Sequence, residues 1–176
     1  MGNLKESNKL EKHYTPQHLL DHLTDRLEEF INVDNITEFQ ENSAGAGSIL
    51  DQLKSKYDIN VEAYDIYNET EREDIQTFDY LKKKDIEYKE GRVCVMNPPF
   101  NKGIKFLYKS LEECDYTVCL LSINSFINID YDKYEVDYID VYKKADFGSC
   151  QVGICILGVY KRSNIENVNK IRNKNV

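Results

Sequence analysis

Val93-Cys94-Val95-Met96-Asn97-Pro98-Pro99-Phe100 is an apolar run that ends in a stiff turn, and this stretch decides the fold. Its first four residues have the length and the β-branched character of a buried strand. The two prolines fix φ and remove two backbone donors, so the strand must end there in an extended turn. A rigid turn that carries an amide and an aromatic ring is suited to holding a flat, amino-bearing ring. Because proline turns also follow strands where nothing binds, the surrounding sequence must decide between a structural and a functional interpretation.

The N-terminal part of the chain is typical of an amphipathic helix. Thr15 is a suitable N-cap, Pro16 is tolerated in a first turn, and the pattern ends near Asp34-Asn35. The apolar residues at helical spacing are Leu19, Leu20, Leu23, Leu27, Phe30 and Ile31.

Strand and helix signals then alternate up to the proline turn. Residues 36–41 alternate as a strand, and a loop of small residues leads into a helix from Ile49 to Tyr57. A second strand is predicted at 61–66 and a weaker one at 74–78. The charged segment 82–91 is interpreted as loop or short helix.

The same alternation continues after the turn. A helix is predicted from Ile104 to Leu111, and a fifth strand from Tyr116 to Leu121. Segments 136–141 and 151–160 are predicted as two strands joined by a turn near Asp146-Gly148. This order indicates an α/β fold with a doubly wound, mostly parallel sheet and one antiparallel strand.

The composition favours a single globular domain that spans residues 1–176. The chain has 13 Tyr, 7 Phe and 31% charged residues, and it has no apolar segment that resembles a signal peptide or a membrane span. The cysteines form no Cys-x-x-Cys pair and are predicted to be buried, reduced thiols, which favours a cytoplasmic protein without a membrane partner. They are Cys94, Cys114, Cys119, Cys150 and Cys155.

The net charge of −8 argues against a large surface that neutralises phosphates. Segment 161–176 differs, because it has five basic residues and one acidic residue. A basic tail could reach nucleic acid, although a frayed, solvated terminus is the more conservative interpretation.

In a doubly wound sheet, ligands bind beyond the carboxyl ends of the strands. Gly45 and Gly47 follow the first predicted strand, where they let the backbone approach a ligand closely. Leu50 occupies the place of the third glycine of the dinucleotide fingerprint, which disfavours NAD. Asp65 ends the second strand and is suited to accept ribose hydroxyl protons, and Asp79 follows the third strand at the same edge.

Together these segments resemble the amino-methyltransferases that use S-adenosylmethionine, in particular the DNA adenine-N6 methyltransferases of bacteria and phages. Tyr14-Thr15-Pro16 is similar to the family's N-terminal cofactor motif. Glu41-Asn42-Ser43-Ala44-Gly45-Ala46-Gly47 is similar to its Glu-Pro-Ser-Ala-Gly-x-Gly loop, with Asn42 in place of proline. Asn97-Pro98-Pro99-Phe100 is similar to its catalytic Asp/Asn-Pro-Pro-Tyr/Phe motif. These three motifs, with the strand-end acids Asp65 and Asp79 between the last two, occur in the family's order and cover most of the chain.

The resemblance implies a Rossmann-like class I methyltransferase fold and assigns roles to the matched residues. It implies that the cofactor contacts Tyr14, Thr15, Pro16, Glu41, Ser43, Ala44, Gly45, Gly47 and Asn97, with Asp65 on the ribose and Asp79 near the adenine. No metal is implied. The resemblance implies a nucleic acid as the partner, in particular DNA. A separate recognition subunit would be a second partner if another protein selects the target sequence.

The chemistry of the proline turn is consistent with these roles. The lone pair of an exocyclic amine is delocalised into its ring until both amine protons are held. The Asn97 side-chain oxygen and the Pro98 carbonyl can hold those protons by accepting hydrogen bonds from them, and Pro99 keeps the turn stiff. Phe100 can stack on the base, a contact worth about 1–3 kcal/mol. Because a base within a duplex cannot enter such a site, the adenine would be flipped out or already single-stranded.

The sequence also departs from the family. The family's separate target-recognition region has no counterpart here, and segment 122–135, with Asp130 and Asp132, matches phosphates poorly. Recognition by another subunit, weak specificity on single strands, or a substrate other than DNA would each explain this. RNA amines, protein glutamine, and an inactive cofactor-binding or structural subunit therefore stay open as alternatives.

Two other groups of residues favour structural roles. His18 and His22 have metal-pair spacing, but Leu19 stands where a zinc protease has its glutamate, so a solvated helix face is preferred. The tyrosines at 131, 134, 138 and 142 are interpreted as a strand face and its approach, with substrate contact as the less favoured interpretation.

Overall fold

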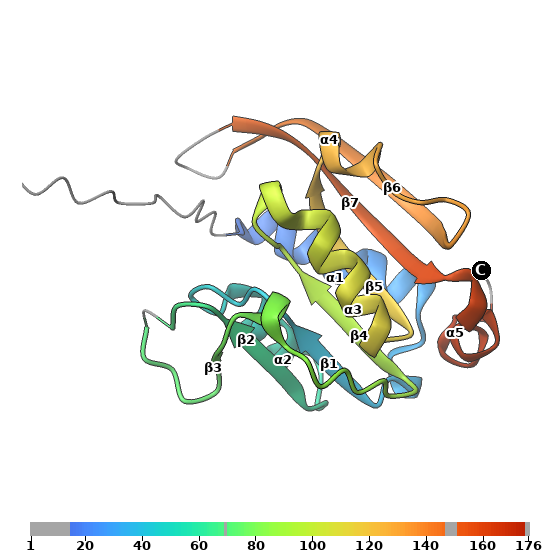
Figure 1. The fold of residues 1–176 in the computed structure, drawn as a ribbon, viewed down its shortest axis with the longest axis horizontal. Helices are drawn as coiled ribbons and strands as arrows, with labels where there is room; N and C mark the ends of the chain where they lie inside the picture. Colours follow the sequence, from blue (N-terminus) through green and yellow to red (C-terminus); the bar gives the residue numbers. More distant parts are fainter. Residues whose placement is uncertain (1–14, 69, 147–150, 175–176) are drawn as a thin grey trace, which may run out of the picture.

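The computed structural model describes residues 15–68, 70–146 and 151–174, and these ranges form one seven-stranded sheet (Figure 1). The strand order is β3-β2-β1-β4-β5-β7-β6. Neighbours from β3 to β5 are parallel, whereas β7 runs antiparallel to both β5 and β6. The predicted mostly parallel sheet with one antiparallel strand is therefore confirmed. The strands are β1 (Glu38–Glu41), β2 (Val61–Asp65), β3 (Gln76–Thr77), β4 (Arg92–Met96), β5 (Tyr116–Ser122), β6 (Tyr134–Asp146) and β7 (Gln151–Lys161).

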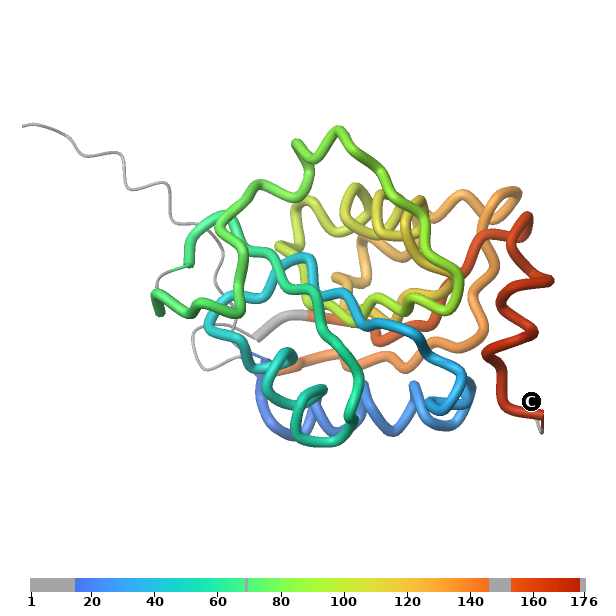
Figure 2. The backbone as a smooth tube through the Cα atoms, turned by 90° about the horizontal axis from the view of Figure 1, so that it is seen from below, coloured from blue at the N-terminus to red at the C-terminus, as the bar shows by residue number. Residues whose placement is uncertain are grey.

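Helices cover both faces of the sheet. In Figure 2, α1 lies on one side of the strands and α3 on the other, with α5 at one end. The α-helices are α1 (Gln17–Phe30), α2 (Ser48–Lys56), α3 (Gly103–Glu113), α4 (Ile123–Phe126) and α5 (Ile165–Ile171). Short 3-10 turns are η1 (Val33–Asn35), η2 (Tyr80–Lys82), η3 (Phe100–Lys102) and η4 (Arg162–Asn164). Among the described residues, no helix combines the length and the apolar character that crossing a membrane needs.

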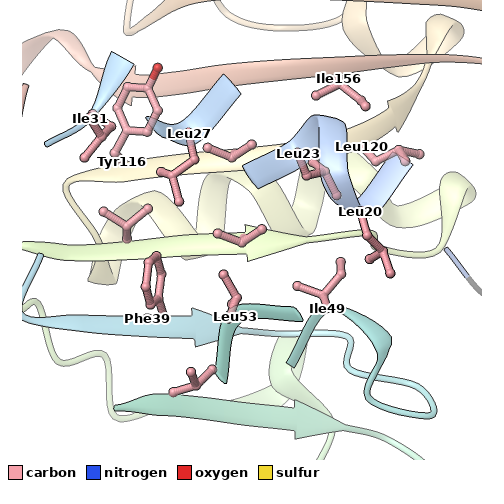
Figure 3. Close-up of a cluster of buried hydrophobic side chains, with 14 of the residues drawn as sticks. Leu20, Leu23, Leu27, Ile31, Phe39, Ile49, Leu53, Tyr116, Leu120 and Ile156 are labelled. Atoms are coloured by element: carbon pink, nitrogen blue, oxygen red, sulfur yellow. The ribbon is translucent and has the colours of Figure 1, made fainter. Parts of the chain in front are cut away.

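Two apolar clusters form the core, one on each face of the sheet. Figure 3 shows one of these clusters, to which Leu23 and Leu27 of α1, Phe39 of β1 and Leu53 of α2 all contribute. The opposite cluster joins α3 to the other face of β4, β5 and β7. Because successive side chains of a strand point to opposite faces, a residue's position along β1 determines which helical layer it meets.

Three sequence predictions near the helices and loops are wrong in detail. Pro16, not Thr15, precedes α1, and it makes no side-chain cap. The helix ends at Phe30 rather than near Asp34, because Ile31 has an extended backbone and forms an antiparallel bridge with Arg172. The weak third strand forms only two residues. Segment 122–135, for which no helix or strand was predicted, contains α4 and the start of β6.

The basic C-terminal segment is neither a frayed end nor a free arm over residues 161–174. Val168 and Ile171 of α5 are buried, and Arg172 forms an isolated antiparallel bridge with Ile31. Four of its cations pair with carboxylates elsewhere in the chain: Lys161 with Glu112, Arg162 with Glu135, Lys170 with Glu90, and Arg172 with Asp137. These cations are therefore engaged within the protein, and Lys174 is the exception.

Candidate functional site

A small pocket lies where β1 and β4 end, and it gathers residues from three distant parts of the chain. It is lined by Thr15, Glu41, Ser43, Ala44, Gly45, Ala46, Ser48, Ile49 and Asn97. Six of these nine residues belong to the site predicted from sequence. The parallel register brings them together, because the carboxyl ends of β1 and β4 meet at one edge of the sheet.

The loop between β1 and α2 has a backbone that requires glycine. Gly45 and Gly47 have φ values of 55° and 92°, which lie in the left-handed region. The Ala44 amide donates to the Tyr64 carbonyl at 2.9 Å, which fixes the loop to β2. Arg72 covers Gly47 so closely that a Cβ there would lie 2.3 Å from its Nη1. A side chain at position 47 would therefore both strain the backbone and displace Arg72.

Glu41 is the most perturbed acid of this pocket. Its side chain is 0% exposed, and Oε1 accepts hydrogen bonds from the Ser43 amide and hydroxyl. Oε2 is buried and has no hydrogen-bond partner among the described residues. Burial raises the pKa of Glu41 to about 8, although the hydrogen bonds from the Ser43 amide and hydroxyl lower it. The carboxyl group is thus held neutral near pH 7 unless a cation reaches it.

Asp65 ends β2 and is oriented by the backbone around it. Its Oδ2 accepts a hydrogen bond from the Gly45 amide, and its Oδ1 accepts one from the Tyr67 amide, each at 2.8 Å. A carboxylate oxygen has a second lone pair, so both oxygens keep the capacity to accept from a ligand. Asp65 lies beside the glycine loop, as the sequence predicted.

A second pocket adjoins the first across Ser43, which lines both. It is lined by Asn42, Ser43, Asp65, Ile66, Phe78, Asp79, Tyr80, Leu81, Pro99, Lys102 and Phe106. Asp79 caps η2 by accepting from the Leu81 amide at 3.2 Å, and Lys82 lies 3.4 Å from its other oxygen. Aromatic and aliphatic side chains with acidic groups at the rim are suited to a planar, amino-bearing ring next to a diol.

The proline turn is joined to the N-terminal segment by a hydrogen bond of its first residue, Asn97. Asn97 Nδ2 donates to Thr15 Oγ1 at 3.0 Å, across 82 positions of sequence. This bond directs the amide nitrogen toward Thr15 and turns the Oδ1 acceptor the other way. Pro98 is buried, and Pro99 precedes η3, which begins with the partly exposed Phe100. The Thr15 hydroxyl therefore orients the amide instead of capping α1.

A groove adjoins this turn at Phe100, with a volume of about 720 Å³. Its walls are η3, the first turn of α3, the end of β5, α4 and one residue of β7. It is lined by Phe100, Asn101, Lys102, Gly103, Ile104, Lys105, Ser122, Asn124, Ser125, Asn128 and Gly153. No acidic residue is among them, and Lys102 also lines the second pocket.

The structure brings together most, but not all, of the predicted residues. Tyr14 lies outside the described residues. Pro16, Gly47 and Pro98 support the site's backbone but line neither small pocket nor the groove. Sequence reasoning missed several wall residues: Asn42, Ile49, Ile66, Phe78, Tyr80, Lys102 and Phe106. Only Asn42 carried a signal, because it replaces the proline of the motif.

The remaining residues singled out from the sequence line none of these three pockets. His22 Nε2 lies 2.9 Å from Asp140 Oδ2, and no cluster of three metal-binding side chains occurs in the described ranges. Tyr134 and Tyr138 are buried, but they belong to the two opposite core clusters because a register shift lies between Val136 and Tyr138. The prediction that they share one strand face is therefore wrong. The four cysteines within the described ranges are buried free thiols, and Cys150 lies outside those ranges.

The sequence matches no protein-family model and no curated protein. Solved structures do match the fold. Thermoplasma acidophilum 1320 has 17% identity and a TM-score of 0.65, with 88% of this chain and 93% of that one covered. PH1948 from Pyrococcus horikoshii, provisionally described as an RNA methyltransferase, has 15% identity and a TM-score of 0.64. The match covers 86% of this chain and 88% of that one. The 23S rRNA methyltransferase ErmE has 12% identity and a TM-score of 0.63, with 86% of this chain and 70% of that one covered. The chain thus has the Rossmann-like fold of class I methyltransferases.

Proposed function

We propose that the chain transfers a methyl group from S-adenosylmethionine to the exocyclic amino nitrogen of adenine in DNA. The observation that carries the proposal is the first pocket, where Thr15, Glu41, Gly45 and Asn97 line one site although they come from three separate motifs. Random placement of motif-like residues would not gather them at one sheet edge.

The residues present fit this cofactor on chemical grounds. Glu41 Oε2 is buried without a partner, which suits the ammonium group of an amino acid. Asp65, oriented by two backbone amides, suits the ribose hydroxyls. The second pocket combines apolar walls with Asp79, which suits an adenine ring. Because Ser43 lines both pockets, one elongated ligand can occupy them together.

The chain's own residues would act on the target amine. When bound, the cofactor supplies an electrophilic methyl group on a sulfonium centre. Asn97 Oδ1 and the Pro98 carbonyl would accept hydrogen bonds from the two amine N–H groups, which localises the nitrogen lone pair as positive charge develops. One N–H proton would leave to solvent after methyl transfer. Thr15 acts as a positioning residue, since it holds the Asn97 amide in one orientation. Phe100 would stack on the adenine, so catalysis rests mainly on positioning.

The groove beside Phe100 supports a nucleic acid as the substrate. Lys102 and Lys105 are exposed and form no ion pair with any described residue. The groove's other polar groups are serine and asparagine side chains, which commonly contact phosphate oxygens. The uncapped start of α3 adds the partial positive charge of a helix N-terminus. A nucleic-acid strand that lies along the groove would bring its target base to Phe100.

RNA is the second candidate substrate, because two of the structurally similar proteins carry descriptions as RNA methyltransferases. The groove does not distinguish the two nucleic acids, since its lysines would contact phosphates of either. A separate recognition subunit would provide target choice if the isolated chain shows no sequence preference.

Radiolabelled S-adenosylmethionine offered with DNA, RNA or cell-protein extract tests the proposal. We expect label on adenine N6 of DNA, in single-stranded more than in duplex substrate. Label on RNA alone would move the assignment to the second candidate, and label on protein would reject the nucleic-acid substrate. Cofactor binding without labelling of any substrate would favour an inactive subunit.

Variants of the proline turn test the mechanism with matched controls. Asn97→Ala removes the acceptor and Phe100→Ala removes the stacking ring, so each should abolish methyl transfer while cofactor binding stays measurable. Asn97→Asp and Phe100→Tyr keep an oxygen and a ring, respectively, and should retain part of the activity. Unchanged turnover in both alanine variants would contradict the mechanism.

A further inference from the structure

Asn42 carries an unexplained buried atom in the wall of the second pocket. Its side chain is 1% exposed, and Oδ1 has no hydrogen-bond partner among the described residues. A buried carbonyl oxygen without a partner is unfavourable, and folded proteins rarely retain one unless another group satisfies it. Asn42 follows β1 and shares a wall of this pocket with Asp79.

A buried chain of hydrogen bonds fixes which end of the Asn42 amide is left without a partner. Glu113 is fully buried, and it accepts from Tyr80 at 2.6 Å and from Lys83 at 2.5 Å. Burial alone would raise the pKa of Glu113, but the hydrogen bonds from Lys83 and Tyr80 outweigh it and hold this pKa below its usual value. The carboxylate is therefore ionised at neutral pH and acts only as an acceptor.

The ionised Glu113 sets the orientation of two amides in turn. Gln40 Nε2 donates to the Glu113 carboxylate at 3.3 Å, so Gln40 Oε1 must face the other way. That oxygen accepts from Asn42 Nδ2 at 3.2 Å, and Nδ2 also lies 3.4 Å from Cys94 Sγ. Both hydrogens of the Asn42 amide thus have acceptors, and Oδ1 remains as an acceptor only.

We infer that Asn42 Oδ1 accepts a hydrogen bond from the exocyclic amine of the cofactor's adenine, and so selects an amino-purine over an oxo-purine. The inference rests on the proposed function. An exocyclic amine has two N–H donors, and two acceptors from this pocket's lining are suited to them: the Asp79 carboxylate and Asn42 Oδ1, while Asp65 is assigned to the ribose. An oxo-purine would place a carbonyl oxygen next to the same two acceptors, and these like partial charges would repel each other. A proline at position 42, as in the motif, would have no such oxygen.

The test compares the affinities of two ligands by isothermal titration calorimetry, and needs no turnover. The ligands are S-adenosylhomocysteine and its inosine analogue, in which an oxygen replaces the exocyclic amine. The wild-type protein should prefer the adenine form by at least ~10-fold. Asn42→Leu and Asn42→Ala, which both remove Oδ1, should reduce that preference by roughly 3- to 10-fold, as expected for one neutral hydrogen bond. The second variant covers the case in which leucine does not fit.

Phe78→Leu is the matched control, because it changes another wall of the same pocket without removing an acceptor. It should weaken both ligands similarly and leave their ratio unchanged. A ratio that stays at the wild-type value in folded, binding-competent Asn42 variants would overturn the inference and leave the proposed function intact. Failure of the wild-type protein to bind either ligand would instead overturn the proposed cofactor, and the inference with it.

Discussion

Glu41→Gln is the most informative single substitution, because it removes one ionisation and keeps the shape of the side chain. Glutamine retains the oxygen that accepts from Ser43 and fills the same buried space. In the free wild-type protein the Glu41 carboxyl has a pKa of about 8 because it is buried. At pH 7 it would therefore carry about 0.9 of a proton. An ammonium ligand next to Oε2 would favour the carboxylate and expel that proton.

Ligand binding should consequently be linked to pH. The affinity for S-adenosylhomocysteine should rise roughly tenfold per pH unit between about pH 6 and 8, and then level off. Between about pH 6 and 7 an α-amino group is largely protonated. The slope of affinity against pH in that interval therefore reports the protonation of the protein and not that of the ligand. In Glu41→Gln the affinity should be lower above pH 8 and nearly independent of pH below it.

The same carboxyl should make stability depend on pH. A carboxyl whose pKa is raised in the folded state binds more protons there than in the unfolded chain. Its contribution is therefore full below about pH 4.5 and is lost as the pH rises through 8. The ideal upper bound is about 5 kcal/mol. Relative to wild type, Glu41→Gln should be equally stable near pH 5 and more stable at pH 9, as measured by urea unfolding.

Calorimetry at pH 6.5 in buffers with different ionisation enthalpies measures the proton directly. The binding enthalpy plotted against buffer ionisation enthalpy should give about one proton released for wild type and none for Glu41→Gln. Glu38→Gln is the control on the same strand, because hydrogen bonds from Arg92 overcome the effect of burial and keep the Glu38 pKa low. Normal ligand binding by wild type without proton release would refute the reasoning.

Two further predictions concern the loop and the groove. Gly47→Ala should destabilise the protein by about 1–2 kcal/mol in urea unfolding and weaken S-adenosylhomocysteine binding, because φ there is 92°; an unchanged midpoint and affinity would contradict this. Lys102→Glu combined with Lys105→Glu should weaken DNA binding and reduce the slope of log K against log salt by about 2. Lys84→Glu with Lys174→Glu makes the same charge change outside the groove and should leave that slope near the wild-type value. Equal effects of the two pairs would exclude the groove as the DNA-binding surface.

The sequence predicted the elements and strand ends correctly where the signal was local. Apolar runs, the proline turn and the glycine loop each restrict the backbone within a few residues, so the strand ends carrying Glu41, Asp65 and Asn97 were found. Their common location then followed from the rule that parallel strands end at one edge. Local rules and the three-dimensional arrangement agree for this part of the site.

The errors arose where distant partners override local preference. Thr15 has the chemistry of a helix cap, but its hydroxyl meets Asn97 instead. The C-terminal segment looked like a solvated basic tail because its partners, such as Asp137 for Arg172, lie on other elements. The groove was not predicted for the same reason, since η3 and α4 meet there only in the folded chain.

The distribution of ion pairs explains how an acidic chain could bind a polyanion. Many of its arginines and lysines are paired with carboxylates away from the groove, for example Arg92 with Glu38 and Lys83 with Glu113. Such pairs cancel at a distance, so the field near any surface depends on its unpaired charges. The groove has lysines and no carboxylate in its lining. A net charge of −8 would then repel nucleic acid from the rest of the surface and leave the groove as the favoured approach to Phe100.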